Sequence, residues 1–175
     1  ANPLPATPPP PASPPRCSFD RVLVDAPCSG VGAWRRNPDA RWLRRTRPIE
    51  ELLPVQADVL QRAARLVLPG GTLVYATCSL LPEENEAQVE AFLASADGAE
   101  FELAPPEHFG APFDDGYLRL SPARHGCDGF FGAALVRTEG GWTRRGRRSS
   151  GPLAGVGGVA SMRRAVWVGG GGAVW

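Results

Sequence analysis

The chain has 175 residues, which is long enough to bury a hydrophobic core and corresponds to about one domain. No apolar run approaches the length of a membrane span and the first residues do not resemble a signal peptide, so we expect a cytoplasmic protein without membrane contact. The formal net charge is only +1, but residues 140–175 carry six arginines and no acid, while residues 1–139 carry all 18 acids. Any binding of nucleic acid must therefore depend on local basic patches.

The two ends have compositions that do not favour a packed fold. Eight of the first 15 residues are proline, so residues 1–16 are predicted to form a disordered, Pro-rich linker. From Gly140 onward 11 of 36 residues are glycine and no periodicity survives, so residues 140–175 are predicted to be a disordered Gly/Arg-rich tail. The globular part is then expected to span residues 17–139.

The first predicted elements are a strand, a helix and a second strand. Residues 19–26 form an apolar run typical of a buried strand. Pro54 suits the first turn of a helix, whose apolar residues recur at helical spacing until Pro69-Gly70-Gly71 ends it. Residues 72–77 are apolar on both faces, as expected for a central parallel strand.

The second half continues the alternation of strands and helices. A helix is predicted to open at Pro82, with Glu83 and Glu84 near its positive end. A short strand is expected at residues 100–103 and a last one at residues 130–136. Strands joined by helices predict a parallel, doubly wound α/β sheet.

The four cysteines are Cys17, Cys28, Cys78 and Cys127, and they lack the close spacing of a zinc site, so no metal is expected. Cys28 and Cys78 each follow a predicted parallel strand. Because the carboxyl ends of parallel strands meet at one edge of a sheet, we expect the two thiols to lie side by side where α/β folds bind ligands.

Three chemistries use a cysteine at such a position. A redox dithiol usually has a Cys-x-x-Cys motif, which the sequence lacks, and a single nucleophilic cysteine would need a base such as His108 or His125. The third chemistry is addition of a thiolate to carbon 6 of cytosine, which turns the electron-poor ring into an enamine able to accept a methyl group at carbon 5. A second acid or base is then required to release the product.

Several motifs resemble those of the RNA (cytosine-5)-methyltransferases, and most of all the bacterial ribosomal RNA small-subunit enzymes. The matching segments are Asp25-Ala26-Pro27-Cys28-Ser29-Gly30-Val31-Gly32, Tyr75-Ala76-Thr77-Cys78-Ser79, Pro82-Glu83-Glu84-Asn85-Glu86 and His125-Gly126-Cys127-Asp128-Gly129-Phe130-Phe131. The likeness extends over about residues 19 to 137. It implies the carboxyl half of a Rossmann-like, class I methyltransferase sheet that uses S-adenosylmethionine.

The resemblance also implies roles for individual residues. Cys78 would be the nucleophile that adds to carbon 6, and Cys28 would assist release of the product. Asp25 and Pro27 occupy the turn that borders the S-adenosylmethionine site in this family. Cys17 and Cys127 are expected to be incidental, and His125 and Asp128 to be loop residues that precede the last strand.

Arginines and tryptophans are concentrated between Trp34 and Arg47. The candidates for RNA contacts there are Arg35, Arg36, Arg41, Trp42 and Arg44. Arginine forks suit phosphates and aromatic faces suit unstacked bases, so RNA binding is one interpretation of this segment. A solvated loop whose tryptophans cover the core is the other.

One departure from the family concerns the cofactor. The glycine-rich loop and the acidic residue that bind S-adenosylmethionine are expected upstream of residue 19, where this sequence has prolines. We therefore expect an incomplete methyltransferase domain whose first strand is an unpaired edge. The alternative function is an inactive RNA-binding remnant. Neither the RNA nor the oligomeric state follows from the sequence.

Overall fold

The computed structural model describes residues 17–42, 47–104, 113–138 and 165–169. These residues form a seven-stranded mixed sheet in the order β4-β5-β6-β2-β1-β7, with β3 also paired to β6. The strands are β1 (Phe19–Asp25), β2 (Val67–Thr77), β3 (Phe101–Leu103), β4 (Phe113–Asp114), β5 (Tyr117–Leu120), β6 (Phe130–Arg137) and β7 (Ala165–Gly169). The helices are α1 (Ile49–Ala64), α2 (Glu86–Leu93) and α3 (Pro122–His125), with short 3-10 turns at Val31–Ala33 and Pro38–Arg41.

Strands β1 and β2 form the parallel centre of the sheet, as the sequence predicts. Val22 pairs with Leu73 and Val24 with Tyr75, and all four side chains are buried. Helix α1 connects the two strands and packs on this face through residues such as Leu60. The α/β class and the parallel pair are confirmed by this arrangement.

Two helices begin at residues other than those predicted. Helix α1 starts at Ile49, so Pro54 lies inside it rather than in its first turn. The first helical residues need no internal N–H partner, and Pro54 lies close enough to the amino end to be accommodated at the loss of one backbone bond. Helix α2 starts at Glu86, after a turn over the residues from Pro82. Glu84 therefore precedes the helix.

The sheet departs from an all-parallel pattern at β6. This strand is antiparallel to β2, with Leu73 opposite Leu135 and Thr77 opposite Phe131. On its other side, β6 pairs antiparallel with β5 along its first half and with β3 along its second half. An antiparallel strand on an otherwise parallel sheet is common in α/β folds.

Strand β7 occupies the free edge of β1. It runs parallel to β1, with Val22 opposite Val166 and Leu23 opposite Trp167. These residues lie inside the tail that the sequence predicts to be disordered. They also form backbone pairs with β1, whose edge was predicted to be unpaired. The structure differs from the prediction at residues 165–169, because a short apolar strand in a glycine-rich segment gains its stability only from a partner strand. The rest of both predicted disordered ends lies outside the described residues.

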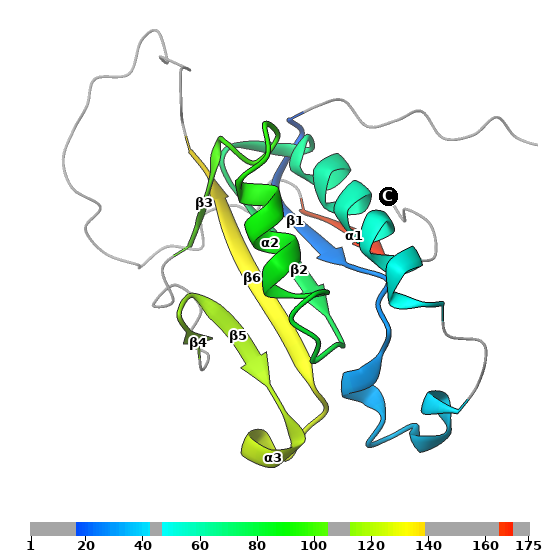
Figure 1. Ribbon diagram of the computed structural model, residues 1–175. Helices are drawn as coiled ribbons and strands as arrows, with labels where there is room; N and C mark the ends of the chain where they lie inside the picture. The colour runs from blue at the N-terminus through cyan, green and yellow to red at the C-terminus, as the bar shows by residue number, and fades with distance from the viewer. Residues whose placement is uncertain (1–16, 43–46, 105–112, 139–164, 170–175) are drawn as a thin grey trace, which may run out of the picture.

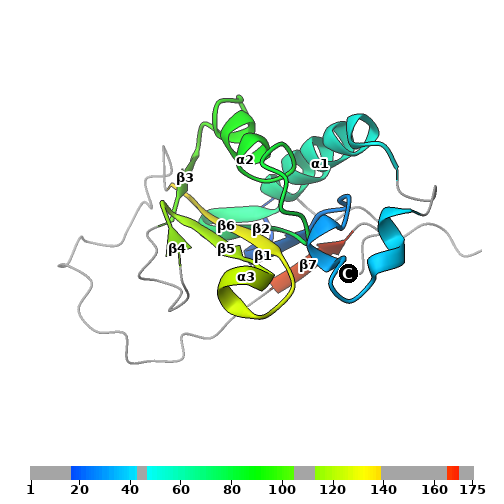
Figure 2. The same cartoon turned by 60° about the horizontal axis from the view of Figure 1, so that its bottom comes forward.

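The described helices α1 and α2 cover one face of the sheet (Figures 1 and 2). Buried side chains of β1, β2 and β6 meet them on this face, among them Tyr75 and Leu135. On β1 and β7 the opposite positions are more exposed, with Leu23 at 39% and Trp167 at 42%. Within the described part of the chain, no helix is long and apolar enough to cross a membrane.

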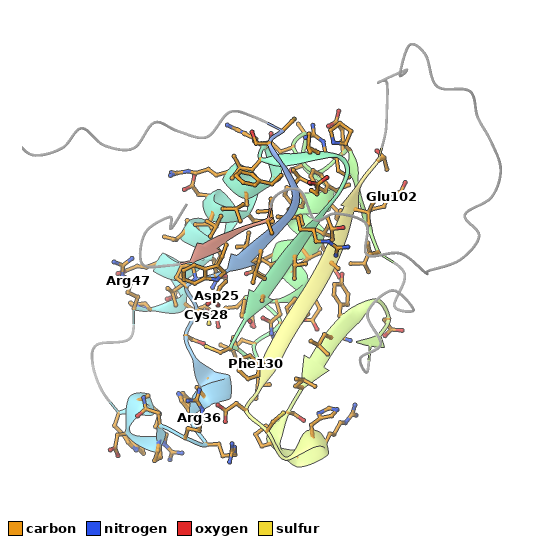
Figure 3. All side chains as sticks on the ribbon, turned by 180° about the vertical axis from the view of Figure 1, so that it is seen from behind. Asp25, Cys28, Arg36, Arg47, Glu102 and Phe130 are labelled. Atoms are coloured by element: carbon orange, nitrogen blue, oxygen red, sulfur yellow. The ribbon has the colours of Figure 1, made fainter. Side chains whose placement is uncertain are left out.

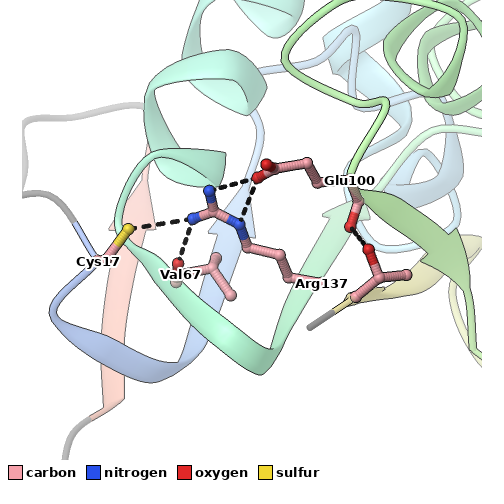
Figure 4. Close-up of polar contacts among 5 residues, drawn as sticks. Cys17, Val67, Glu100 and Arg137 are labelled. Carbon is pink, nitrogen blue, oxygen red and sulfur yellow. Dashed lines mark hydrogen bonds and ion pairs between the residues drawn. The ribbon is translucent and has the colours of Figure 1, made fainter. Parts of the chain in front are cut away.

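Arg137 holds together the end of the sheet opposite the cysteine turns (Figure 4). Its guanidinium donates to the Val67 carbonyl at 2.7 Å, to the Cys17 sulfur at 3.2 Å and to Glu100 Oε2 at 2.5 and 3.0 Å. Through these bonds one arginine links β6 to β2, to the residue before β3 and to the segment before β1. Cys17 thus makes a structural contact at the end of the sheet opposite Cys28 and Cys78.

Candidate active site

The two cysteines predicted to meet do so at the carboxyl ends of β1 and β2. Cys28 lies in the turn after β1 and Cys78 directly follows β2, and their sulfur atoms are 3.4 Å apart. Both side chains are half-buried and neither forms a disulfide. Asp25 and Cys28 lie at this end of β1 in Figure 3. The parallel pairing of the two strands brings together residues that are 50 positions apart in the sequence.

The close contact shifts the pKa values of the two thiols in opposite directions. The hydrogen bond from the Cys28 thiol lowers the pKa of Cys78 from 9.0 to about 7, although burial and the carboxylates of Asp25 and Glu84 act in the opposite direction. The pKa of Cys28 is raised, first by its bond to Cys78 and then by burial. The direction of these shifts favours Cys28 as the donor in the contact and Cys78 as the more acidic thiol of the pair.

A buried polar network, centred on Glu84, lies behind the two cysteine turns. Glu84 accepts hydrogen bonds from both Ser29 and Ser79, the residues that follow Cys28 and Cys78. Glu84, Ser79 and Gln56 have no exposed surface. The sequence analysis placed Glu84 at a helix end and assigned it no site role. The sequence signal for Glu84 was its place in Pro82-Glu83-Glu84-Asn85-Glu86, one of the segments that carry the family resemblance.

Backbone contacts fix a third segment against the same turns. The Gly32 N–H donates to the Cys78 carbonyl at 2.9 Å, and the Gly32 carbonyl accepts from the Gly129 N–H at 2.9 Å. A Cβ atom on Gly32 would lie 2.3 Å from the Gly129 carbonyl oxygen, which no side chain can tolerate. Glycine at position 32 therefore allows the loop before β6 to approach the cysteine turns.

Asp25 is the exposed carboxylate nearest the cysteine turns. It ends β1 and has no hydrogen-bond or ion-pair partner among the described residues. The neighbouring Pro27 shapes the turn, and its carbonyl accepts a bond from Gln56 Nε2 at 2.9 Å. A free carboxylate at the carboxyl end of a parallel strand suits the hydroxyl or ammonium groups of a nucleoside-type ligand.

The predicted RNA-binding residues fall into three groups. Arg35 and Arg36 both pair with the buried Asp128, whose pKa is lowered first by its bond to Arg36. Arg41 lies over the ring of Trp42 at 4.6 Å, and Trp42 is 74% exposed. Arg44 lies outside the described residues. Figure 3 shows Arg36 beyond the end of β1, on the same side as Cys28.

Asp128 was predicted to be an ordinary loop residue, but it is the acceptor that anchors this arginine segment to the loop before β6. His125 ends α3 and its Nδ1 accepts from the Ser121 N–H at 3.1 Å. Cys127 donates to the Asp128 carbonyl. Among the described residues no cluster of three or more acidic, histidine or cysteine side chains could hold a metal ion.

Comparison with known sequences gives consistent matches. Residues 10–136 match the family model described as "16S rRNA methyltransferase RsmB/F". The chain is 50% identical over 119 residues to "Ribosomal RNA small subunit methyltransferase B" of Klebsiella pneumoniae and 44% identical to the protein of the same description from Shewanella oneidensis. These matches cover 68% of this chain but only 26% and 27% of the relatives, so the chain spans about a quarter of their length.

Solved structures give the same result at the level of the fold. The structure titled "Crystal Structure of PH0851" has a TM-score of 0.58 at 43% identity, over 66% of this chain and 26% of that one. NSun6 from Pyrococcus horikoshii with SFG has a TM-score of 0.57 at 30% identity, over 69% of this chain and 30% of that one. With the fold, the paired cysteine turns and a family match over more than half of the sequence, the chain belongs to the RsmB/F family of 16S rRNA methyltransferases.

Proposed function

We propose that this site methylates carbon 5 of cytosine in RNA through a covalent bond between Cys78 and carbon 6 of the base. The observation that carries the proposal is the 3.4 Å contact between Cys28 and Cys78, which leaves a thiolate on Cys78 near neutral pH. The names of the bacterial relatives favour ribosomal RNA as the substrate.

Cys78 supplies the nucleophile in this mechanism. Its sulfur lone pair forms a bond to carbon 6, and the electrons of the 5,6 double bond make carbon 5 nucleophilic. Carbon 5 then accepts the methyl group, after which a base such as water takes the proton from carbon 5. The electrons of that C–H bond restore the 5,6 double bond, and those of the carbon–sulfur bond return to the Cys78 sulfur as it leaves. A thiol of ordinary pKa would be mostly protonated at pH 7, so the lowered pKa of Cys78 favours the first step.

Cys28 is suited to the last step. Because its pKa is raised, it remains a thiol that can donate its S–H to the Cys78 sulfur 3.4 Å away. When the carbon–sulfur bond breaks, negative charge develops on that sulfur, and a hydrogen bond already aimed there stabilises the leaving thiolate. We therefore assign Cys28 to product release.

Membership of this family implies S-adenosylmethionine, which when bound would supply the methyl group. Asp25 is suited to bind one part of this cofactor. Its exposed carboxylate, without a described partner, is available to a hydroxyl or ammonium group of the cofactor. Pro27 would contribute the fixed backbone of the turn between Asp25 and Cys28.

RNA contacts are assigned to the arginine segment. Arg41 and the exposed ring of Trp42 present a cation and an aromatic face to solvent, the combination that binds phosphates and unstacked bases. Arg35 and Arg36 are about half exposed or more despite their bonds to Asp128, so their outer N–H groups can contribute. Arg44 remains a prediction from the sequence.

The test is a chimera in which the 119 matched residues of this chain replace the corresponding segment of the Klebsiella relative. Incubated with S-adenosylmethionine and ribosomal RNA at about pH 8.5, where a thiol of ordinary pKa is half ionised, the Cys28→Ala chimera should accumulate an RNA–protein adduct on a denaturing gel. The Cys78→Ala chimera should form neither adduct nor 5-methylcytosine.

Cys127→Ala is the matched control, because this half-buried cysteine lies outside the sulfur pair and should leave both readouts unchanged. An adduct in Cys78→Ala and its loss in Cys28→Ala would show that the roles are reversed. If none of the chimeras forms an adduct or methylates RNA, the catalytic proposal fails.

RNA binding without catalysis is the second candidate function. The observation in its favour is that the described residues provide one free carboxylate for the cofactor, while Arg41 and Trp42 are open to solvent. This function predicts that the 175-residue chain retards RNA on a native gel but forms no adduct and no 5-methylcytosine. An adduct formed by the chain itself would decide for the enzyme.

A further inference from the structure

Glu84 connects the two cysteine turns through both of its carboxylate oxygens. Oε1 accepts from the Ser29 backbone N–H at 2.8 Å and from Gln56 Nε2 at 3.0 Å. Oε2 accepts from the Ser29 hydroxyl at 2.5 Å and from the Ser79 hydroxyl. Ser29 directly follows Cys28 and Ser79 directly follows Cys78. The side chain thus bonds the residue after each cysteine.

Burial of the Glu84 side chain limits how far its hydrogen-bond donors can move. Glu84 is fully buried, and every described side-chain partner of its carboxylate is a neutral donor. A buried carboxylate that loses such donors is left with a large desolvation cost, so the donors and the turns that carry them are held at fixed distances. Tyr75 adds a bond from its hydroxyl to the Glu84 carbonyl at 2.7 Å, which fixes the backbone as well.

We propose that Glu84 is a positioning residue for the reaction, setting the separation of Cys28 and Cys78 by binding the residue that follows each of them. The inference deepens the proposed function, because a thiol pair held at 3.4 Å is what makes Cys78 nucleophilic and Cys28 its hydrogen-bond donor. Glu84 does not touch either sulfur among the described contacts and acts through Ser29 and Ser79.

Glu84 can change the pKa of Cys78 in two opposite directions, through its charge and through its hold on the cysteine turns. The proposal can therefore be tested by the direction of the change. Three groups face the Cys78 sulfur: the Cys28 thiol lowers its pKa, whereas the carboxylates of Asp25 and Glu84 raise it. The Cys28 bond is the largest of these influences and Glu84 the smallest. If Glu84 acts by position, its loss weakens the Cys28 bond and raises the pKa of Cys78. If it acts by charge alone, its loss lowers that pKa.

The experiment measures iodoacetamide alkylation of each cysteine in the 175-residue chain between pH 6 and pH 10, by mass spectrometry. In Glu84→Gln the amide keeps one acceptor oxygen but cannot hold both turns. The rate at Cys78 at pH 7 should fall about fivefold, since a pKa moved from about 7 to about 8 leaves about one tenth of the thiol ionised.

Ser79→Ala is the second variant, because it removes one link and leaves the charge of Glu84 in place. It should change the Cys78 profile in the same direction as Glu84→Gln. Glu83→Gln is the matched control, since this neighbouring glutamate is exposed and should leave the profile unchanged. The alkylation rate of Cys127 reports whether each variant is folded, and if Glu84→Gln is not, Ser79→Ala decides.

Faster alkylation of Cys78 in Glu84→Gln together with no change in Ser79→Ala would overturn the proposal, because charge alone would then explain the effect. The readout needs no methyl transfer. If the alkylation result holds and the chimera still forms no adduct, the positioning role stands for the thiol pair and only the proposed function fails.

Discussion

At the scale of single residues, the chemistry of the site depends on which of two cysteines keeps the proton. The sequence offers Cys28 and Cys78 in similar surroundings, each after an apolar strand and before a serine. The 3.4 Å contact between the two sulfur atoms is symmetrical, but their surroundings raise the pKa of Cys28 and lower that of Cys78. In the proposed function, the choice of nucleophile therefore depends on the neighbouring cysteine and not on either motif alone.

Substitution of Cys28 by alanine should raise the pKa of Cys78, because the hydrogen bond that chiefly stabilises the thiolate is removed. With its pKa lowered to about 7, Cys78 keeps a substantial thiolate fraction down to about pH 7. Without the Cys28 donor, the same thiolate fraction is reached only at a higher pH. The pH dependence of Cys78 alkylation measures this. A profile identical to that of the unaltered chain would contradict the assigned donor.

At the scale of elements, short segments acquire their structure from their partners. Strand β7 has five residues, and its side chain at Val166 is buried in the core shared with β1 and α1. The segment that contains Arg41 and Trp42 is likewise held by its contacts, since Arg35 and Arg36 pair with Asp128 and Gly32 bonds to Cys78 and Gly129. Neither segment has a sequence period that would predict its place.

Val166→Ala should lower the free energy of unfolding by about 1–2 kcal/mol, because it removes two buried carbon atoms at about 0.8 kcal/mol each. Thermal denaturation followed by circular dichroism measures the loss. Ala165→Ser, at an exposed position of the same strand, is the control and should change stability little. Equal effects of the two substitutions would show that β7 does not contribute to the core.

Arg41→Gln combined with Trp42→Ala should weaken RNA binding by the 175-residue chain, because it removes an exposed cation and the aromatic face beneath it. Affinity measured across a range of salt concentrations should also show a shallower salt dependence, as one phosphate contact is lost. Arg62→Gln, an exposed α1 arginine that pairs with Asp58, is the control for a loss of charge alone. If the control weakens binding equally, the effect is nonspecific.

At the scale of the whole molecule, the sheet is unequally covered by the described elements. Both α1 and α2 lie on one face (Figure 2), while Leu23 and Trp167 on β1 and β7 are exposed and Asp25 ends β1. The described residues therefore contain both cysteines of the pair, while the residues proposed to contact the cofactor are one carboxylate and a turn.

We expect the 175-residue chain to show no heat of S-adenosylmethionine binding by calorimetry at ligand concentrations below about 1 mM. Loss of about 4 kcal/mol of cofactor contacts is enough to move a dissociation constant from about 1 µM to about 1 mM. Methyl incorporation into ribosomal RNA by this chain alone should be absent for the same reason. A micromolar dissociation constant would show that the chain builds the cofactor site without further segments.

The sequence by itself determined the α/β class, strands β1 and β6, residues 72–77 of β2, and the meeting of Cys28 with Cys78. These followed from local information, since apolar runs define buried strands and parallel strands end at the same edge of a sheet. The sequence placed Val67 in the preceding helix, whereas β2 begins at that residue. The tertiary structure decided the antiparallel direction of β6, the pairing of β7 with β1, the division of acidity within the thiol pair and the burial of Glu84. Each of these depends on atoms brought together from distant parts of the chain, and sequence periodicity carries no information about such contacts.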